Sequence, residues 1–220
     1  FRTLPAYYFT ILVIILLSFL LGRDINIRGV FKSMFFVQNI TFHSGNFFPE
    51  SWSLSIEEWF YLSLPLLLSM IYMLTNFSIK KNLLLAFFII LGFSIAVRFY
   101  IYSTTNVQSV GDWDQAFRSL VITRLDSLLM GVLGAWFFIF NQFFFSKYKN
   151  AFFIIGLIIF ITNKIYSDYF LQNFNNLYVT VIYFSLISFS VLLMLPKFYF
   201  LEKTNFKAID NVIAKGSLIS

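Results

Sequence analysis

Long runs of apolar side chains recur along most of this 220-residue chain, and they constrain its fold more than any other feature. Crossing the roughly 30 Å of bilayer hydrocarbon takes about 20 residues of helix. Six segments near that length are bounded by polar or charged residues: Leu4–Leu21, Trp52–Leu74, Asn82–Tyr102, Ser119–Phe140, Ala151–Tyr166 and Leu177–Phe198. The mean hydropathy is +0.80, so the chain has more apolar surface than the core of one soluble domain could bury. The pattern predicts an all-α polytopic membrane bundle of about six transmembrane helices.

One further apolar segment, Gly29–Phe42, lies between the first two predicted spans. It has 14 residues, which is short for a membrane crossing. We therefore expect it to form a re-entrant or interfacial segment. No repeat or low-complexity linker divides the chain, so residues 1–220 are predicted to form a single membrane domain.

Basic residues in the loops predict the orientation of the spans. Lysines gather in alternate loops, which we expect in the cytoplasm: Lys80, Lys81, Lys147, Lys149, Lys197, Lys203 and Lys207. Loops 103–118 and 167–176 then lie outside, and so does the start of the second span. Arg23, Arg28 and Lys32 oppose this orientation unless the short segment crosses and the first span is reversed. The basic residues behind the net charge of +6 thus indicate which loops are cytoplasmic, and they do not form a surface for nucleic acid.

Five ionisable side chains from three predicted spans fall at a similar depth: Glu57, Glu58, Arg98, Arg124 and Asp126. At about 1.5 Å per residue, each lies roughly 8 Å below the outer end of its helix. A charge inside a membrane is costly, so such residues usually face a bundle interior or a water-filled cavity and pair with one another. Three acids against two arginines leave about one carboxylate without a cationic partner. That carboxylate is a candidate for acid/base or hydroxyl-binding chemistry.

The same charged layer also has a structural interpretation. Pairs of glutamate and arginine can lock helices together without forming an active cavity, and both interpretations stay open. Successive helix positions differ by about 100°, so Glu57 and Glu58 point in neighbouring directions, whereas Arg124 and Asp126 differ by about 200°. We therefore expect Asp126 to find a partner other than Arg124.

The remaining candidate residues carry weaker signals. His43 is the only histidine and precedes a turn, where a loop imidazole is the default and a substrate contact is the alternative. Asp112 and Gln115 have the spacing of a capping box that opens the fourth span. The chain has no Cys, Walker loop, zinc-ligand pattern or Ser-His-Asp order. The sequence thus predicts no bound metal or cofactor and no soluble-type hydrolase site.

The stretch SWSLSIEEWFYLSLPLLL resembles the hallmark of acyltransferase family 3, multipass membrane O-acyltransferases with a pattern close to W-S-L-x-x-E-x-x-F-Y-x-x-x-P. Every fixed position is met, by Trp52, Ser53, Leu54, Glu57, Phe60, Tyr61 and Pro65. Two further stretches agree in order and spacing. Residues 1–7, FRTLPAY, resemble the family's Arg-x-x-Arg-x-x-Pro stretch from its second arginine on, and RLDSLLMG, from Arg124 to Gly131, resembles its later R-x-D-x-x-x-x-G helix.

This resemblance implies an enzyme of the bacterial inner (plasma) membrane. Such an enzyme takes an acyl group, most often acetyl, from acyl-coenzyme A and delivers it to a hydroxyl of a cell-envelope glycan. The acceptor would be lipopolysaccharide O-antigen, exopolysaccharide or a lipid-linked sugar. The family's catalytic histidine and a preceding arginine lie before the matched region and are absent here. We therefore expect residues 1–220 to be an internal fragment, truncated at both ends and inactive alone.

The resemblance also implies roles for individual side chains. Arg2 would bind the phosphates of coenzyme A through its planar guanidinium. Glu57, and less directly Glu58, would hold the acceptor hydroxyl or orient the base, with Arg98 or Arg124 as the counter-charge. The candidate catalytic residues are Glu57, Glu58, Arg124 and Asp126, and the candidate substrate contacts are Trp52, Arg98 and His43.

Two other classes of protein compete with this interpretation. A charged layer inside a helix bundle equally suits a transporter, such as a flippase for lipid-linked sugars. A purely structural membrane subunit would pair its charges without leaving a cavity between them.

Overall fold

The computed structural model describes residues 3–40, 47–105, 107, 109–170 and 176–200, and all regular structure in these ranges is helical. The predicted all-α membrane bundle is thereby confirmed. Four helical stretches in the described part are long and apolar enough to cross a membrane. They contain α3 (Trp52–Leu74), α4 (Ile79–Thr104), α8 (Lys149–Phe170) and α9 (Tyr183–Tyr199), the last preceded without a break by a π-helical turn, Tyr178–Ile182.

The other two predicted spans form apolar helices of lesser length. Helix α1 covers Leu4–Leu20 with 17 residues and α6 covers Leu125–Phe140 with 16 residues. The prediction that the fourth span begins at Ser119 is wrong. A 3₁₀ turn precedes α6, and there the Val121 N–H donates to the carbonyl of Asn39 at 3.0 Å. Leu120, just before this turn, is extended, with ψ of 131°, so the helix begins later than the apolar run does.

The predicted capping box also has different partners. It opens the short helix α5 (Val110–Trp113), and Ser109 is its N-cap. The Ser109 hydroxyl accepts from the Asp112 N–H at 3.1 Å, and the Asp112 carboxylate accepts from the Ser109 N–H at 3.1 Å. Asp112 is thus the N3 residue of the box, its fourth position, and not the N-cap. Gln115 lies in the π-helical turn that follows, Asp114–Arg118.

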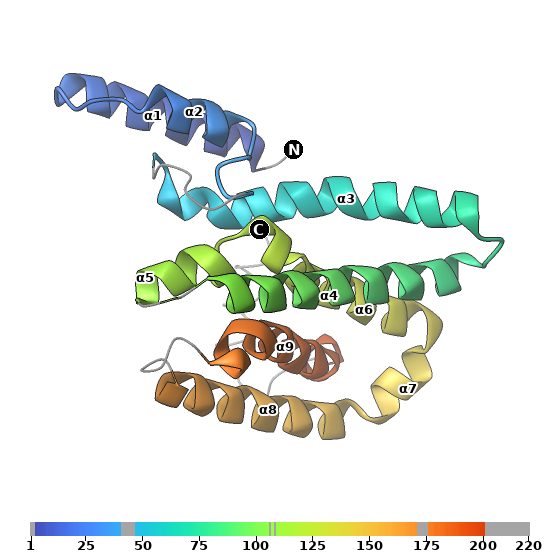
Figure 1. Cartoon of the computed structure of the whole chain (residues 1–220). Helices are drawn as coiled ribbons and strands as arrows, with labels where there is room; N and C mark the ends of the chain where they lie inside the picture. Colours follow the sequence, from blue (N-terminus) through green and yellow to red (C-terminus); the bar gives the residue numbers. More distant parts are fainter. Residues whose placement is uncertain (1–2, 41–46, 106, 108, 171–175, 201–220) are drawn as a thin grey trace, which may run out of the picture.

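The bundle is built from antiparallel helices packed side by side (Figure 1). Helices α3 and α4 form a hairpin, and α9 lies between α4 and α8 in this view. Helices α8 and α9 approach most closely at Gly156, where an added Cβ would lie 2.7 Å from the carbonyl oxygen of Ser190. A short helix α7 (Gln142–Lys147) joins α6 to α8. Glycine thus sets the spacing of the two C-terminal helices, as small residues do in membrane bundles.

Helices α1 and α2 lie at one edge of the bundle, and α1 extends past the end of α3 (Figure 1). Helix α2 (Ile27–Met34) has 8 residues, about 12 Å of helix. The Tyr7 hydroxyl of α1 donates to the Ser33 carbonyl at 2.7 Å. The indole N–H of Trp59 donates to the Phe36 carbonyl at 2.9 Å. Residues 29–40 therefore fold back along the bundle edge without a crossing helix, as the length of Gly29–Phe42 predicts, while residues 41 and 42 lie outside the described ranges.

Candidate functional site

The charged layer contains one ion pair inside the bundle. Arg98 of α4 and Asp126 of α6 both have fully buried side chains, and Nη2 of Arg98 lies 2.5 Å from Oδ2 of Asp126. Ser185 of α9 joins them: its hydroxyl accepts from Arg98 at 2.9 Å and donates to Asp126 at 2.6 Å. Asp126 therefore pairs with a residue other than Arg124, as the helical angles predict. Three helices meet at this one polar contact.

This contact favours the helix-locking interpretation for Arg98 and Asp126. Arg98 also donates through Nε to the Ser94 carbonyl, at 3.2 Å, so its guanidinium is held on two sides. Neither side chain has any exposed surface, although each was a candidate for substrate or catalytic chemistry. A buried pair is strongly destabilising to break, because the remaining charge loses its partner.

Arg124 lies outside this pair, just before α6 begins. Its guanidinium carbon is 4.4 Å from the centre of the Phe184 ring, a cation–π contact with α9. Its Nε and Nη1 atoms are buried and have no hydrogen-bond partner in the described part of the chain. Because Arg124 precedes the helix, its direction is not set by the helical periodicity that the sequence argument assumed.

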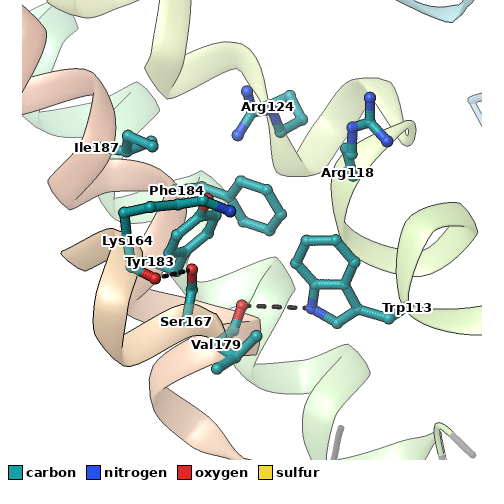
Figure 2. A pocket seen from close by; sticks show the side chains of 9 residues that line it. All are labelled: Trp113, Arg118, Arg124, Lys164, Ser167, Val179, Tyr183, Phe184 and Ile187. Atoms are coloured by element: carbon teal, nitrogen blue, oxygen red, sulfur yellow. Dashed lines mark hydrogen bonds between the residues drawn. The ribbon is translucent and has the colours of Figure 1, made fainter. Parts of the chain in front are cut away.

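A cavity of about 300 Å³ opens beside Arg124, and we call it the cationic cavity. It is lined by Trp113, Arg118, Arg124, Lys164, Ser167, Val179, Tyr183, Phe184 and Ile187 (Figure 2). Three lining residues are basic, and none of those nine is acidic. Arg118 bonds to Asp114 at 2.8 Å, and Lys164 bonds to Asp168 at 2.8 Å. Trp113 and Arg118 belong to the range 103–118 and Ser167 begins the range 167–176, so the cavity lies on the side that the lysine pattern predicts to be outside.

Glu57 and Glu58 of α3 do not join these charges. Both are half-buried, and neither forms an ion pair or a hydrogen bond with another described residue. The predicted pairing of Glu57 with Arg98 or Arg124 is therefore wrong. Asp126 and Ser185 already occupy Arg98, and the break before α6 directs Arg124 onto Phe184.

Glu57 and Glu58 also lie apart from three cavities of the described part. Neither lines the cationic cavity or the two apolar cavities beside α6 and α9. Counting depth along ideal helices thus placed the five charges in one layer, but it could not place them on one face.

The other predicted site residues are placed as follows. Trp52 is half-buried at the start of α3, where its carbonyl accepts from Asn39 at 3.1 Å. The Arg118 guanidinium lies over its ring, 5.3 Å from the centre, so this arginine touches both Trp52 and the cationic cavity. Arg2 and His43 lie outside the described residues. No cluster of three or more potential metal ligands occurs within the described ranges.

The sequence argument missed Lys164, Arg118 and Ser185. Lys164 lies inside a predicted span, so the rule that singled out Arg98 could have found it. Ser185 carries no such signal, because serine is common in membrane helices.

Comparison of the chain with protein-family models, with curated proteins and with solved structures returned no match.

Proposed function

We propose that the full-length protein is a membrane O-acyltransferase. It moves an acyl group, acetyl in the first place, from acyl-coenzyme A to a hydroxyl of a cell-envelope glycan or a lipid-linked sugar. The observation that carries this proposal is the run from Trp52 to Pro65, which meets each fixed position of the acyltransferase family 3 pattern. The proposal includes the bacterial inner membrane as the location of the protein.

The packing around Glu57 supports its role in the proposal. Ile56 and Phe60 are 5% and 4% exposed and belong to the apolar cluster that joins α3 to α4 and α6. They hold the α3 backbone on both sides of Glu57, while the Glu57 side chain stays without an ionic partner in the described chain. A fixed backbone with an uncommitted carboxylate suits a group that positions a substrate.

In the proposed reaction the acceptor hydroxyl attacks the thioester carbonyl of the donor. A new C–O bond forms, the C–S bond breaks, and the hydroxyl proton ends on the thiol of coenzyme A. Glu57 accepts a hydrogen bond from the hydroxyl and orients it, and a base of the full-length protein carries the proton. The Arg98–Asp126 pair takes no part in these steps, and it holds α4, α6 and α9 as the frame beside α3.

The test is transfer of labelled acetyl from acetyl-coenzyme A to envelope glycan in membrane vesicles that contain the full-length protein. We expect label in the glycan as an alkali-labile ester, and none in vesicles from cells that lack the gene. Export of a lipid-linked sugar without any acyl donor would instead support the transporter alternative. Absence of transfer with every short acyl-coenzyme A and every envelope glycan tried would overturn the proposal.

A further inference from the structure

We propose that the cationic cavity binds a phosphoryl group. This inference does not rest on the acyltransferase proposal, because it uses different residues and a different surface. The cavity is formed by α5, the turns before α6, the end of α8 and the start of α9 (Figure 2).

The first argument is charge. The described cations around the cavity have carboxylate partners in three cases: Arg98 with Asp126, Arg118 with Asp114, and Lys164 with Asp168. Arg124 forms no ion pair with a described residue. With no acid among the lining residues, this leaves one uncompensated positive charge at the cavity wall. An anion in the cavity would neutralise it.

The second argument is the state of the Arg124 guanidinium. Phe184 holds it by a cation–π contact, which restrains its position but accepts no ordinary hydrogen bond. Its buried Nε and Nη1 thus stay unsatisfied by the described protein. Buried donors without partners are unusual and unfavourable, so the guanidinium gains if it turns toward a ligand in the cavity that supplies the acceptors. Oxygen atoms of a phosphoryl group fit these planar, charged donors.

The third argument is access and size. The side chains of Arg118 and Lys164 are 51% and 56% exposed, so they form a rim beside the half-buried Arg124. A volume of about 300 Å³ is near the lower limit for ligand pockets, enough for a phosphoryl group and a small carrier. Trp113 forms a rigid wall, because its indole N–H donates to the Val179 carbonyl at 3.3 Å. Arg118 and Lys164 form exposed ion pairs, which are weak, so both can turn from their carboxylates to a doubly charged phosphate ester beside Arg124.

The phosphoryl group has two possible sources, a soluble phosphate compound and a lipid headgroup. The experiment uses full-length protein in phosphatidylcholine nanodiscs and measures the thermal unfolding midpoint. One arm titrates inorganic pyrophosphate in solution, and the other replaces part of the lipid with phosphatidylglycerol. A rise of the midpoint in the first arm identifies a soluble ligand, and a rise only in the second arm identifies a headgroup. Either rise supports the proposal, provided that it depends on the cavity arginine as described next.

The decisive variant is Arg124→Gln, which removes the charge and keeps most of the side-chain length. We expect it to weaken binding by about tenfold or more, the scale of losing a buried charged contact. The matched control is Arg23→Gln, at an exposed arginine distant in sequence from the cavity, and binding should be unchanged. No midpoint shift in either arm, or equal binding by Arg124→Gln and the wild type, would overturn the proposal.

Two rim variants keep the test decisive if Arg124→Gln does not fold. Arg118→Gln and Lys164→Gln change half-exposed side chains, so the fold should tolerate them. Each should weaken binding about threefold, and the effect should shrink as salt rises. Unchanged binding in both would overturn the proposal. Since no acyl donor is present in this assay, its result is separate from that of the acetyl-transfer test.

Discussion

Two acidic side chains of the charged layer, Asp126 and Glu57, lie in opposite surroundings. Asp126 is fully buried between α4, α6 and α9 and is bound by both Arg98 and Ser185. Glu57 is half-buried on α3 and has no ionic partner among the described residues. A carboxylate that is held by a cation and a hydroxyl stabilises the bundle, whereas one without such partners is the better candidate for the substrate contact that we propose. Depth in the membrane therefore does not by itself assign a function to a charge.

The strongest test of this comparison breaks the pair in the bundle. Asp126→Leu leaves the Arg98 guanidinium buried without its partner, so we expect a loss of about 3–5 kcal/mol of stability. Thermal unfolding of the detergent-solubilised protein measures the change. The double variant Arg98→Met with Asp126→Leu removes both charges and should recover most of the loss. A stable Asp126→Leu single variant would show that the pair does not lock the helices.

The next test concerns Glu57, and its measurement is the rate of acetyl transfer by the proposed acyltransferase. Glu57→Gln keeps the shape of the side chain but removes its charge, and we expect turnover to fall by about a hundredfold. The unfolding midpoint should stay near that of the wild type, because no described partner is lost. The matched control is Glu50→Gln, at an exposed position one turn before α3, which should change neither property. If the Glu57→Gln protein is destabilised but transfers acetyl at the normal rate, Glu57 serves stability as Asp126 does, and the contrast between them fails.

Much of the fold could be predicted from the positions of the apolar runs. The helices α1, α3, α4, α8 and α9 occupy these runs, because a buried backbone in lipid has to satisfy its own hydrogen bonds. The start of α6 could not be predicted in this way. Leu120 is extended inside the apolar run, with ψ of 131°, and the Val121 N–H bonds to the distant carbonyl of Asn39, and neither feature leaves a periodic signal in the sequence.

The candidate site was predictable only in part, for a similar reason. Depth counting found Arg98 and Asp126 at one level. Arg124 is not the partner of Asp126, as expected, but Arg124 precedes α6, so the helical angle between the two residues is not the reason. The identity of the partner depends on how α4, α6 and α9 are rotated against one another, and on the Ser185 hydroxyl between them. No spacing within a single helix contains that information.

A third test compares close and open helix packing with two glycines. Gly156→Ala puts a Cβ 2.7 Å from the Ser190 carbonyl oxygen, so α8 and α9 have to separate, at a cost of about 1–3 kcal/mol. Gly92→Ala in α4 is the matched control, since its Cβ meets nothing within 4 Å. That change should be neutral or should stabilise the helix by up to about 1 kcal/mol. Equal unfolding midpoints for the two variants would show that α8 and α9 do not depend on close contact at Gly156.

The smallest effects are expected from two helix caps, one in the bundle and one at its edge. Ser109 caps α5, which packs through Trp113 into an apolar cluster of the bundle, whereas Asn26 caps α2 at the edge and accepts from the Gly29 N–H at 3.0 Å. Replacing either cap with alanine removes about 1 kcal/mol of local stability. Ser109→Ala should lower the global unfolding midpoint, because α5 cannot open without exposing Trp113.

Asn26→Ala should instead act locally. Helix α2 buries only Gly29 and Ser33, so it can open while the bundle stays folded. We expect faster amide hydrogen exchange over residues 27–34 and an unchanged global midpoint. If Asn26→Ala lowers the midpoint as much as Ser109→Ala does, the edge and the bundle unfold as one unit. In that case α3, which carries Glu57 and bonds to the edge through Trp59 and Phe36, would belong to the same cooperative unit as the Arg98–Asp126 pair.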